Sequence, residues 1–167
     1  GVTEGVNQLI ERLNVPPETI KFFIHGTTVS TNALLERKGA VTALIVTEGF
    51  RDVLQIGRQD RPSLYDWRMQ RPPPLVPRHL RYEVPERVLH TGEVLRPLQD
   101  GALEDVGQRL EELGVEAVAV CLLHSYANPS HEQAVAAALS KALPGAAMSL
   151  SYDVVPEFKE YERMSTT

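Results

Sequence analysis

One stretch of the sequence, residues 22–39, constrains the fold of this chain more than any other. It begins with the aromatic and β-branched run at residues 22–24, which predicts a buried strand, and this run ends at Gly26. Hydroxyl and amide side chains follow and lead into a short helix pattern that ends at Gly39. We therefore expect a strand–turn–helix corner, where unpaired backbone N–H groups and the positive end of a helix dipole lie at the carboxyl edge of a sheet. Anions and polar ligands bind at such edges in open α/β folds.

Six side chains of this corner can donate or accept hydrogen bonds: His25, Thr27, Thr28, Ser30, Thr31 and Asn32. Ser, Thr and Asn favour helix starts because they cap them, but one cap explains only one of the six residues. We expect part of the loop to contact a ligand, and the helix dipole favours an anionic or carbonyl-bearing group. His25 is suited to donate a proton or orient a ligand, although a lone histidine at a strand end is more often structural.

The strand predicted for residues 41–46 has five apolar residues out of six. With the first strand and the intervening helix it makes a βαβ unit, which implies a parallel pair with a right-handed crossover. The turn that begins at Thr47 should then lie at the same sheet edge as His25. The other expected elements are a helix at residues 2–13, a hairpin of residues 82–89 and 93–95, helices at 102–113 and 131–143, and strands at 117–123 and 147–150.

Together these patterns predict one α/β domain over residues 1–167. Because the strands are buried runs rather than alternating ones, the sheet should be mostly parallel with helices on both faces, plus one antiparallel hairpin. Near the end of the chain, Glu157, Glu160 and Glu162 are expected to form one solvated helix face.

The composition changes in residues 58–80. Five prolines forbid a long helix or an interior strand, while Tyr65 and Trp67 are too apolar for a solvated linker, so we expect an ordered excursion packed on the body. Nine of the thirteen arginines lie between positions 51 and 96, where no lysine occurs. Arginine without lysine suggests bidentate contacts to carboxylate or phosphate, with Arg58 and Arg61 as candidates. The alternative is pairing with acidic residues of the same stretch: Asp52, Asp60, Asp66, Glu83, Glu86 and Glu93.

The formal net charge of −5 argues against a nucleic-acid or anionic-membrane binder, which needs a basic surface. The single cysteine cannot form an internal disulfide, and no apolar run is long enough to cross a bilayer, so a cytoplasmic location is expected. The phosphate-binding and dinucleotide-binding glycine motifs are both absent. A metal site of Cys121, His124 and His131 is not favoured, because a fourth ligand is missing and Cys121 falls in a predicted strand.

Several segments of the sequence are characteristic when taken together: residues 25–40, 44–59, 61–62, 64–66, 85–88, 122–132 and 156–167. They resemble the amino-terminal region of the hydantoinase A / 5-oxoprolinase family, which includes hydantoin-utilisation and N-methylhydantoinase proteins. The resemblance covers nearly the whole chain but only part of the family's protein, and a match this long is more specific than any short motif.

The resemblance implies a truncated amino-terminal lobe of a larger subunit, with a fold similar to the acetate kinase, sugar kinase and actin (ribonuclease H-like) superfamily. Family members couple ATP hydrolysis to opening a cyclic amide such as a hydantoin or 5-oxoproline, so ATP and Mg²⁺ are expected in the full-length protein. Related subunits belong to ATP-dependent acetone and acetophenone carboxylases. A third alternative is a non-catalytic assembly domain that docks a hydantoinase B-type partner subunit, and a homo-oligomer is also possible.

The resemblance assigns no catalytic residue to this chain. In the family, a phosphate-binding hairpin precedes the position of Gly1 and a second lobe follows that of Thr167, so the chain alone is expected to be inactive and to bind no cofactor. The residues expected to bind substrate or phosphate are His25, Gly26, Thr27, Thr28, Asn32, Arg58 and Arg61.

Overall fold

The computed structural model describes residues 2–14, 16–22, 24, 26–60, 63, 65–66, 68–69, 71–99 and 101–167. Its contacts divide the chain into two compact units, Gly1–Lys38 and Gly39–Thr167. Each unit is described by itself, and one domain over residues 1–167 stays a prediction. None of the helices in the described ranges combines the length and the hydropathy needed to cross a membrane.

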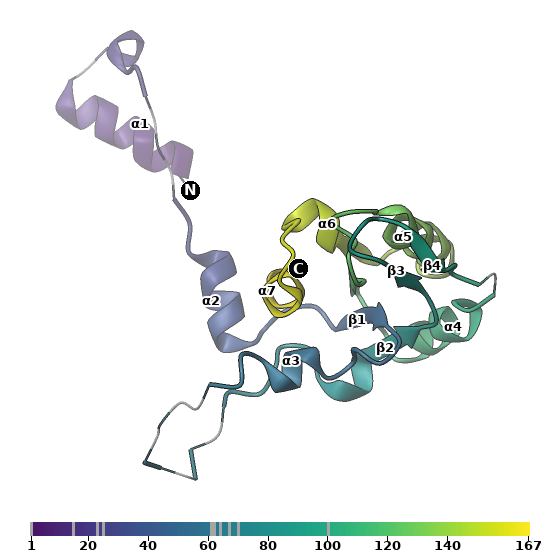
Figure 1. Cartoon of the computed structure of the whole chain (residues 1–167). Helices are drawn as coiled ribbons and strands as arrows, with labels where there is room; N and C mark the ends of the chain where they lie inside the picture. Colours follow the sequence, from purple (N-terminus) through teal and green to yellow (C-terminus); the bar gives the residue numbers. More distant parts are fainter. Residues whose placement is uncertain are drawn as a thin grey trace. The chain divides into compact units, whose positions relative to one another are not determined.

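The second unit is built on a four-stranded sheet (Figure 1). Its strands are β1 (Thr42–Thr47), β2 (Arg81–Val84), β5 (Ala117–Cys121) and β6 (Ala147–Leu150), in the order β2-β1-β5-β6, and each neighbouring pair is parallel. Five of the six residues of β1 are buried, as expected for a strand covered on both faces. The predicted class of fold, a mostly parallel sheet with helices and one antiparallel hairpin, is confirmed.

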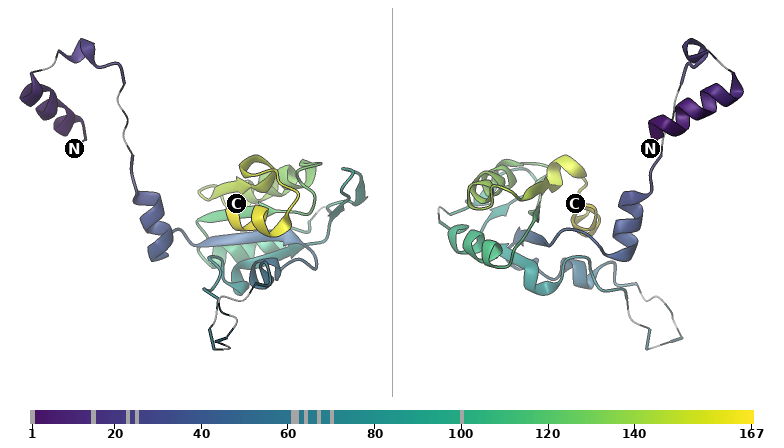
Figure 2. Two further views of the ribbon diagram at one scale, coloured as in Figure 1. Left: turned by 60° about the vertical axis from the view of Figure 1, so that its left-hand side comes forward. Right: turned by 180° about the vertical axis from the view of Figure 1, so that it is seen from behind.

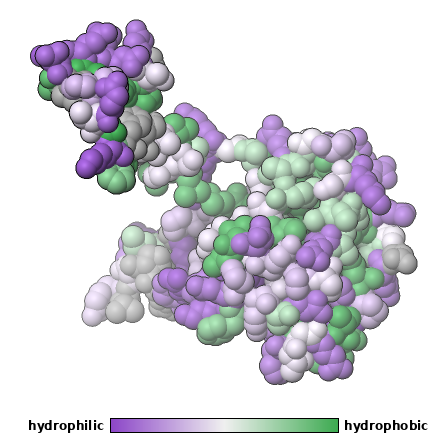
Figure 3. Space-filling view, turned by 90° about the horizontal axis from the view of Figure 1, so that it is seen from above, coloured by the Kyte–Doolittle hydropathy of each residue, from purple (hydrophilic) through white to green (hydrophobic). Residues whose placement is uncertain are grey.

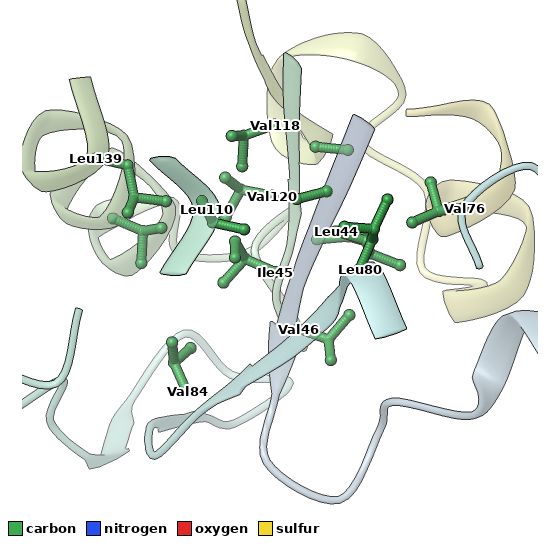
Figure 4. Packing of buried hydrophobic residues seen from close by; sticks show 14 of the residues in the cluster. Leu44, Ile45, Val46, Val76, Leu80, Val84, Leu110, Val118, Val120 and Leu139 are labelled. Carbon is green, nitrogen blue, oxygen red and sulfur yellow. The ribbon is translucent and has the colours of Figure 1, made fainter. Parts of the chain in front are cut away.

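Helices cover both faces of this sheet (Figures 1 and 2). Figure 4 shows Leu110 and Leu139 with Val120 on one face of the sheet. Val76 and Leu80 lie with Leu44 on the other face. All six side chains belong to one buried cluster. The helices of this unit are α3 (Val53–Ile56), η2 (Arg78–Leu80), α4 (Glu104–Glu112), α5 (Ser130–Ala142), α6 (Ser151–Val154) and α7 (Glu160–Thr166).

The hairpin differs from the prediction in its first half. It consists of β3 (Arg87–Val88) and β4 (Val94–Arg96), whereas residues 81–84 join the main sheet as β2. Pro85 has no backbone N–H to continue a ladder, and the next side chain, Glu86, is buried at 2% exposure. The single strand expected over residues 82–89 is therefore two strands in two sheets.

The first unit contains α1 (Val2–Leu13), the 3-10 helix η1 (Pro17–Thr19) and α2 (Val29–Glu36). Helix α1 occupies the residues expected for it. Helix α2 ends earlier than expected, because Arg37 adopts a left-handed conformation with φ of 54° and its N–H bonds back to Ala33 and Leu34. Among the described residues of this unit no side chain is buried, and apolar surface is accordingly visible in green in Figure 3.

The strand predicted for residues 22–24 is wrong for the two residues that are described. Phe22 and Ile24 are 87% and 92% exposed and belong to no strand, while Phe23 lies outside the described residues. Strand β1 already has β2 and β5 as its two neighbours, so it has no free edge for a further strand. Without a partner, an extended run leaves its backbone N–H and C=O groups unpaired. The predicted parallel pair of these two segments is therefore not formed.

The excursion of residues 58–80 has two parts. Val76 and Leu80 join the core at 9% and 7% exposure, whereas Tyr65 is 96% and Met69 54% exposed. Arg71 donates to the backbone oxygens of Ile56 and Asp60, which ties the return of the excursion to its start. The described apolar side chains near its tip therefore lie outside the core.

Candidate functional site

The predicted ligand-binding loop lies at the start of α2 in the first unit. Gly26, Thr27, Thr28 and Asn32 are all exposed. The Thr27 hydroxyl accepts a hydrogen bond from the Val29 N–H at 3.3 Å, and Asn32 Nδ2 donates to the Thr28 hydroxyl at 3.5 Å. Thr28 is the N-cap residue, but its side chain makes no capping bond. These contacts are long and local, so both hydroxyls can still bind a ligand.

The first turn of α2 also offers backbone donors. No acceptor within the described part of the chain bonds the N–H groups of Ser30 and Thr31. Such N–H groups, together with the helix dipole, favour an anion. His25 lies outside the described residues. The expectation that its loop shares a sheet edge with Thr47 depended on the strand at residues 22–24, and that strand is not formed.

Arg58 is bonded to α7. Its Nε donates to Glu162 Oε1 at 2.9 Å, and its Cζ lies 5.8 Å from the centre of the Tyr161 ring. The hydrogen bond with Arg58 holds the pKa of Glu162 below its ordinary value. Arg58 therefore pairs with an acid outside its own stretch, and Arg61 lies outside the described residues. Because Arg58 and α2 belong to different units, their common site stays a prediction.

Pairing of arginine with nearby acids, the alternative raised by the sequence, does occur. Arg78 binds both oxygens of Asp52 at 2.9 and 3.1 Å, which holds the pKa of Asp52 below its ordinary value. Arg96 bonds Glu48 at 2.6 Å and Arg71 bonds Asp60 at 3.0 Å. All three pairs are partly exposed; those with Asp52 and Asp60 are pairs that the sequence raised, whereas Glu48 lies just outside that stretch.

Arg81 is a buried arginine that the sequence did not single out. It is 1% exposed, and its Nε donates to the Val76 carbonyl at 2.9 Å, while burial lowers its pKa. Arg51 lies beside it and donates to the Arg78 carbonyl at 2.9 Å. Among the described residues, Arg51 Nε is the one buried side-chain nitrogen or oxygen that lacks a hydrogen-bond partner.

Two buried carboxylates bind the carboxyl ends of the parallel strands. The first, Glu86, accepts hydrogen bonds from the Thr47 hydroxyl at the end of β1 and from His131 Nδ1, the latter at 2.7 Å. Thr47 Oγ1 in turn accepts the Leu123 N–H at 2.9 Å. Glu86 thus joins the ends of β1, β2 and β5 to the start of α5.

The second carboxylate, Glu132, is fully buried. It accepts the Leu122 N–H at 2.9 Å, the Ser151 hydroxyl at 2.6 Å and the Tyr152 N–H at 3.1 Å. The buried Arg163 donates to the Leu122 carbonyl at 3.1 Å and to Ser151 Oγ at 3.2 Å. Glu132 and Arg163 therefore join the ends of β5 and β6 to α5 and α7.

Glu160 was expected on a solvated helix face, and this expectation is wrong. Its side chain is 24% exposed and forms an ion pair with Arg163. Burial raises the pKa of Glu160 above its ordinary value, against the opposing effect of Arg163. The sequence signal that was missed is the spacing of Glu160 and Arg163, which places both on one side of α7.

Cys121, His124 and His131 each have other roles than a shared metal site. The Cys121 thiol is buried at the end of β5, and burial raises its pKa to about 12. His131 bonds Glu86, and His124 Nδ1 lies 2.8 Å from the Val88 carbonyl oxygen. No group of three or more His, Cys, Asp or Glu side chains suited to a metal ion occurs within the ranges that the structure describes.

Comparison with known proteins gives consistent matches. Residues 1–143 match the family described as the hydantoinase/oxoprolinase N-terminal region. The chain is 35% identical over 172 residues to caprolactamase subunit alpha of Pseudomonas jessenii, covering 99% of this chain and 25% of that protein. It is 36% identical over 160 residues to 5-oxoprolinase 1 of Arabidopsis thaliana, covering 79% of this chain and 12% of that protein.

Two solved structures are also similar. The crystal structure of the ATP-dependent caprolactamase from Pseudomonas jessenii matches with a TM-score of 0.83 and 34% identity, over 99% of this chain and 25% of that one. The nucleotide-free structure of acetone carboxylase matches with a TM-score of 0.73 and 32% identity, over 81% of this chain and 21% of that one. The chain therefore spans at most about a quarter of the length of these relatives.

Proposed function

The chain belongs to the hydantoinase/oxoprolinase family, and on that premise we propose that it is the amino-terminal part of an ATP-dependent enzyme subunit. This subunit couples ATP hydrolysis to the opening of a cyclic amide such as a hydantoin or 5-oxoproline. The match of residues 1–143 to the family carries this proposal. Relatives named 5-oxoprolinase and caprolactamase support it, since both names denote action on a lactam ring. The similar caprolactamase is described as ATP-dependent.

The start of α2 is the part of this chain that we assign to phosphate or substrate binding. ATP would supply the phosphoryl group that activates a poorly reactive amide carbonyl, with Mg²⁺ neutralising the phosphate charge. The exposed hydroxyls of Thr27 and Thr28 and the unpaired N–H groups of Ser30 and Thr31 fit a phosphate oxygen or a carbonyl. His25, Gly26, Asn32, Arg58 and Arg61 remain proposed members of the same site.

Replacing Thr27 and Thr28 together by alanine tests this assignment in the full-length protein. We expect hydantoin- or oxoproline-dependent ATP turnover to fall by more than about tenfold, the loss of one or two hydrogen bonds to a charged group. The thermal unfolding midpoint should stay unchanged because both side chains are exposed. Thr3→Ala, which removes an exposed hydroxyl from α1 of the same unit, is the matched control. Wild-type turnover in the double variant would contradict the assignment.

A carboxylase subunit is the second candidate, favoured by the similarity to acetone carboxylase and to the acetophenone carboxylase gamma subunit of Aromatoleum aromaticum. Such an enzyme consumes bicarbonate and a ketone. Phosphate release from ATP should therefore be measured with cyclic amides and, separately, with bicarbonate plus acetone or acetophenone. Release with the ketone set alone would replace the first proposal by the second.

An assembly role is the third candidate, because similar proteins are named as subunits and apolar side chains such as Tyr65 and Met69 are exposed. The partner would be a hydantoinase B-type subunit or domain. Mixing the chain with that partner tests the role. Tight binding that is lost when the exposed Tyr65 and Met69 of this segment are replaced by serine supports docking, and no binding counts against it.

A further inference from the structure

The backbone that leaves β5 is held from several sides. The N–H of Leu122 bonds Glu132 and its carbonyl bonds Arg163, while the N–H of Leu123 bonds the Thr47 hydroxyl. The Ser125 hydroxyl lies 2.9 Å from that of Ser151. Residues 122–125 therefore have a conformation that the surrounding buried side chains determine.

His124, in the middle of this segment, has a strained backbone. Its φ is 55°, in the left-handed region, which costs a residue other than glycine about 1–2 kcal/mol. Among the residues that the structure describes, three others that are not glycine have a positive φ, namely Asn14, Arg37 and Gln59, and all three are exposed. His124 is half-buried and rigidly held, and strain of that kind is concentrated at functional sites.

The contacts of the His124 ring fix its orientation. Nδ1 lies 2.8 Å from the Val88 carbonyl oxygen, which can only accept, so Nδ1 carries a proton; in the tautomer that has this one proton, Nε2 keeps its lone pair. His90 and Tyr126 lie edge-on to the ring, with centroids 6.4 and 6.0 Å away.

The Nε2 atom of His124 makes no hydrogen bond within the described part of the chain, and the Glu160 carboxylate, which interacts electrostatically with His124, lies nearby. Among the described residues, Arg51 Nε is the one buried side-chain nitrogen or oxygen that lacks a hydrogen-bond partner. His124 Nε2 also lacks such a partner but is not a buried atom of this kind, so it must reach solvent. An oriented acceptor thus faces outward from the carboxyl edge of the sheet, where ligands bind in open α/β folds.

We propose that His124 is a substrate-binding residue whose Nε2 accepts a hydrogen bond from the ring N–H of a cyclic amide. The proposal rests on the proposed function and narrows it. A cyclic amide such as a hydantoin, 5-oxoproline or caprolactam carries an N–H donor, whereas a ketone such as acetone has none. An acceptor at this position therefore favours the amide, and it predicts that a substrate methylated on that nitrogen is handled poorly.

The test compares a substrate with its N-methyl analogue in the full-length protein. Amide-dependent ATP turnover is first measured with 5-oxoproline, hydantoin and caprolactam, and the active one is then compared with the form methylated on the nitrogen of the amide bond that is opened. In the wild type we expect kcat/KM to favour the N–H substrate by about tenfold or more. His124→Gly should lose about tenfold on the N–H substrate and show nearly equal values for the two forms.

Controls separate this inference from the proposed function and from misfolding. His79→Ala removes an exposed histidine on η2 and should keep the wild-type preference. Glycine accepts the φ of 55° without strain, and if His124→Gly still unfolds, His124→Asn provides a second variant that tolerates it. A wild type without amide-dependent turnover overturns the proposed function. A wild type with turnover, together with a His124 variant of unchanged preference, overturns the inference alone.

Discussion

Changing Glu132 to Gln tests whether the buried carboxylates hold the strand ends together. Glu132 is fully buried and accepts from the Leu122 N–H, the Ser151 hydroxyl and the Tyr152 N–H. Glutamine keeps the volume of the side chain and one carbonyl oxygen, but it replaces the other oxygen by an NH₂ group. If the oxygen stays with Leu122, the NH₂ group faces the N–H of Tyr152, and two donors then oppose each other.

The expected loss of stability follows from these contacts. One partly buried donor without an acceptor costs about 1–3 kcal/mol, and the remaining bonds weaken by about 1 kcal/mol because their acceptor is no longer charged. We therefore expect Glu132→Gln to lower the free energy of unfolding by about 2–4 kcal/mol. Urea unfolding of the wild type and the variant, followed by circular dichroism, measures this difference as a lower midpoint with an unchanged slope.

The matched control is Glu112→Gln, the same chemical change at an ion pair on the surface. Glu112 bonds Arg109 one turn earlier in α4, and both side chains are more than half exposed. Its midpoint should equal that of the wild type, because exposed pairs contribute little. If Glu132→Gln unfolded at the same urea concentration as this control, the assignment of a structural role to the buried carboxylates would be refuted.

Two further predictions concern packing and reactivity. Gly107→Ala should destabilise the second unit by about 1–3 kcal/mol, because the added Cβ would lie 2.9 Å from the Cβ of Ala142. In contrast, the Cβ added by Gly5→Ala in α1 meets nothing within 4 Å, and this variant should have a higher helix content. Thermal melts of both variants check this, and a stabilised Gly107→Ala would contradict the close packing of α4 and α5. Since burial raises the pKa of Cys121 to about 12, the thiol stays neutral at pH 8 in the folded chain. Iodoacetamide should therefore modify it only after urea is added, and mass spectrometry measures the product. Rapid modification without urea would show that the end of β5 is open.

Much of the fold could be predicted from the sequence. The buried run of β1 and the amphipathic patterns of α4 and α5 produce the elements expected for them, within a residue or two at most ends. These elements depend on local periodicity and on turn residues, which the sequence shows directly. The strand predicted at residues 22–24 has equally apolar residues, but a strand also needs a neighbouring edge, and periodicity does not show whether one exists.

The candidate site was predicted less completely. The exposed hydroxyls of Thr27 and Thr28 could be recognised because polar residues cluster at a helix start. Glu86 was interpreted as a possible partner of a nearby arginine, and its true partners, Thr47 and His131, lie 39 and 45 positions away in the chain. No spacing rule links such distant positions.

The sequence by itself determined most of the helices and the buried strands β1, β5 and β6, and its resemblance to a family indicated the class of chemistry. Only the tertiary structure decided that residues 81–84 belong to the main sheet, that Glu86 and Glu132 are buried, and that His124 Nδ1 lies against the Val88 carbonyl oxygen. The physical reason is the range of the interactions. Helices and turns depend on neighbours within a few residues, whereas strand order and buried hydrogen bonds depend on groups that meet only after the chain has folded.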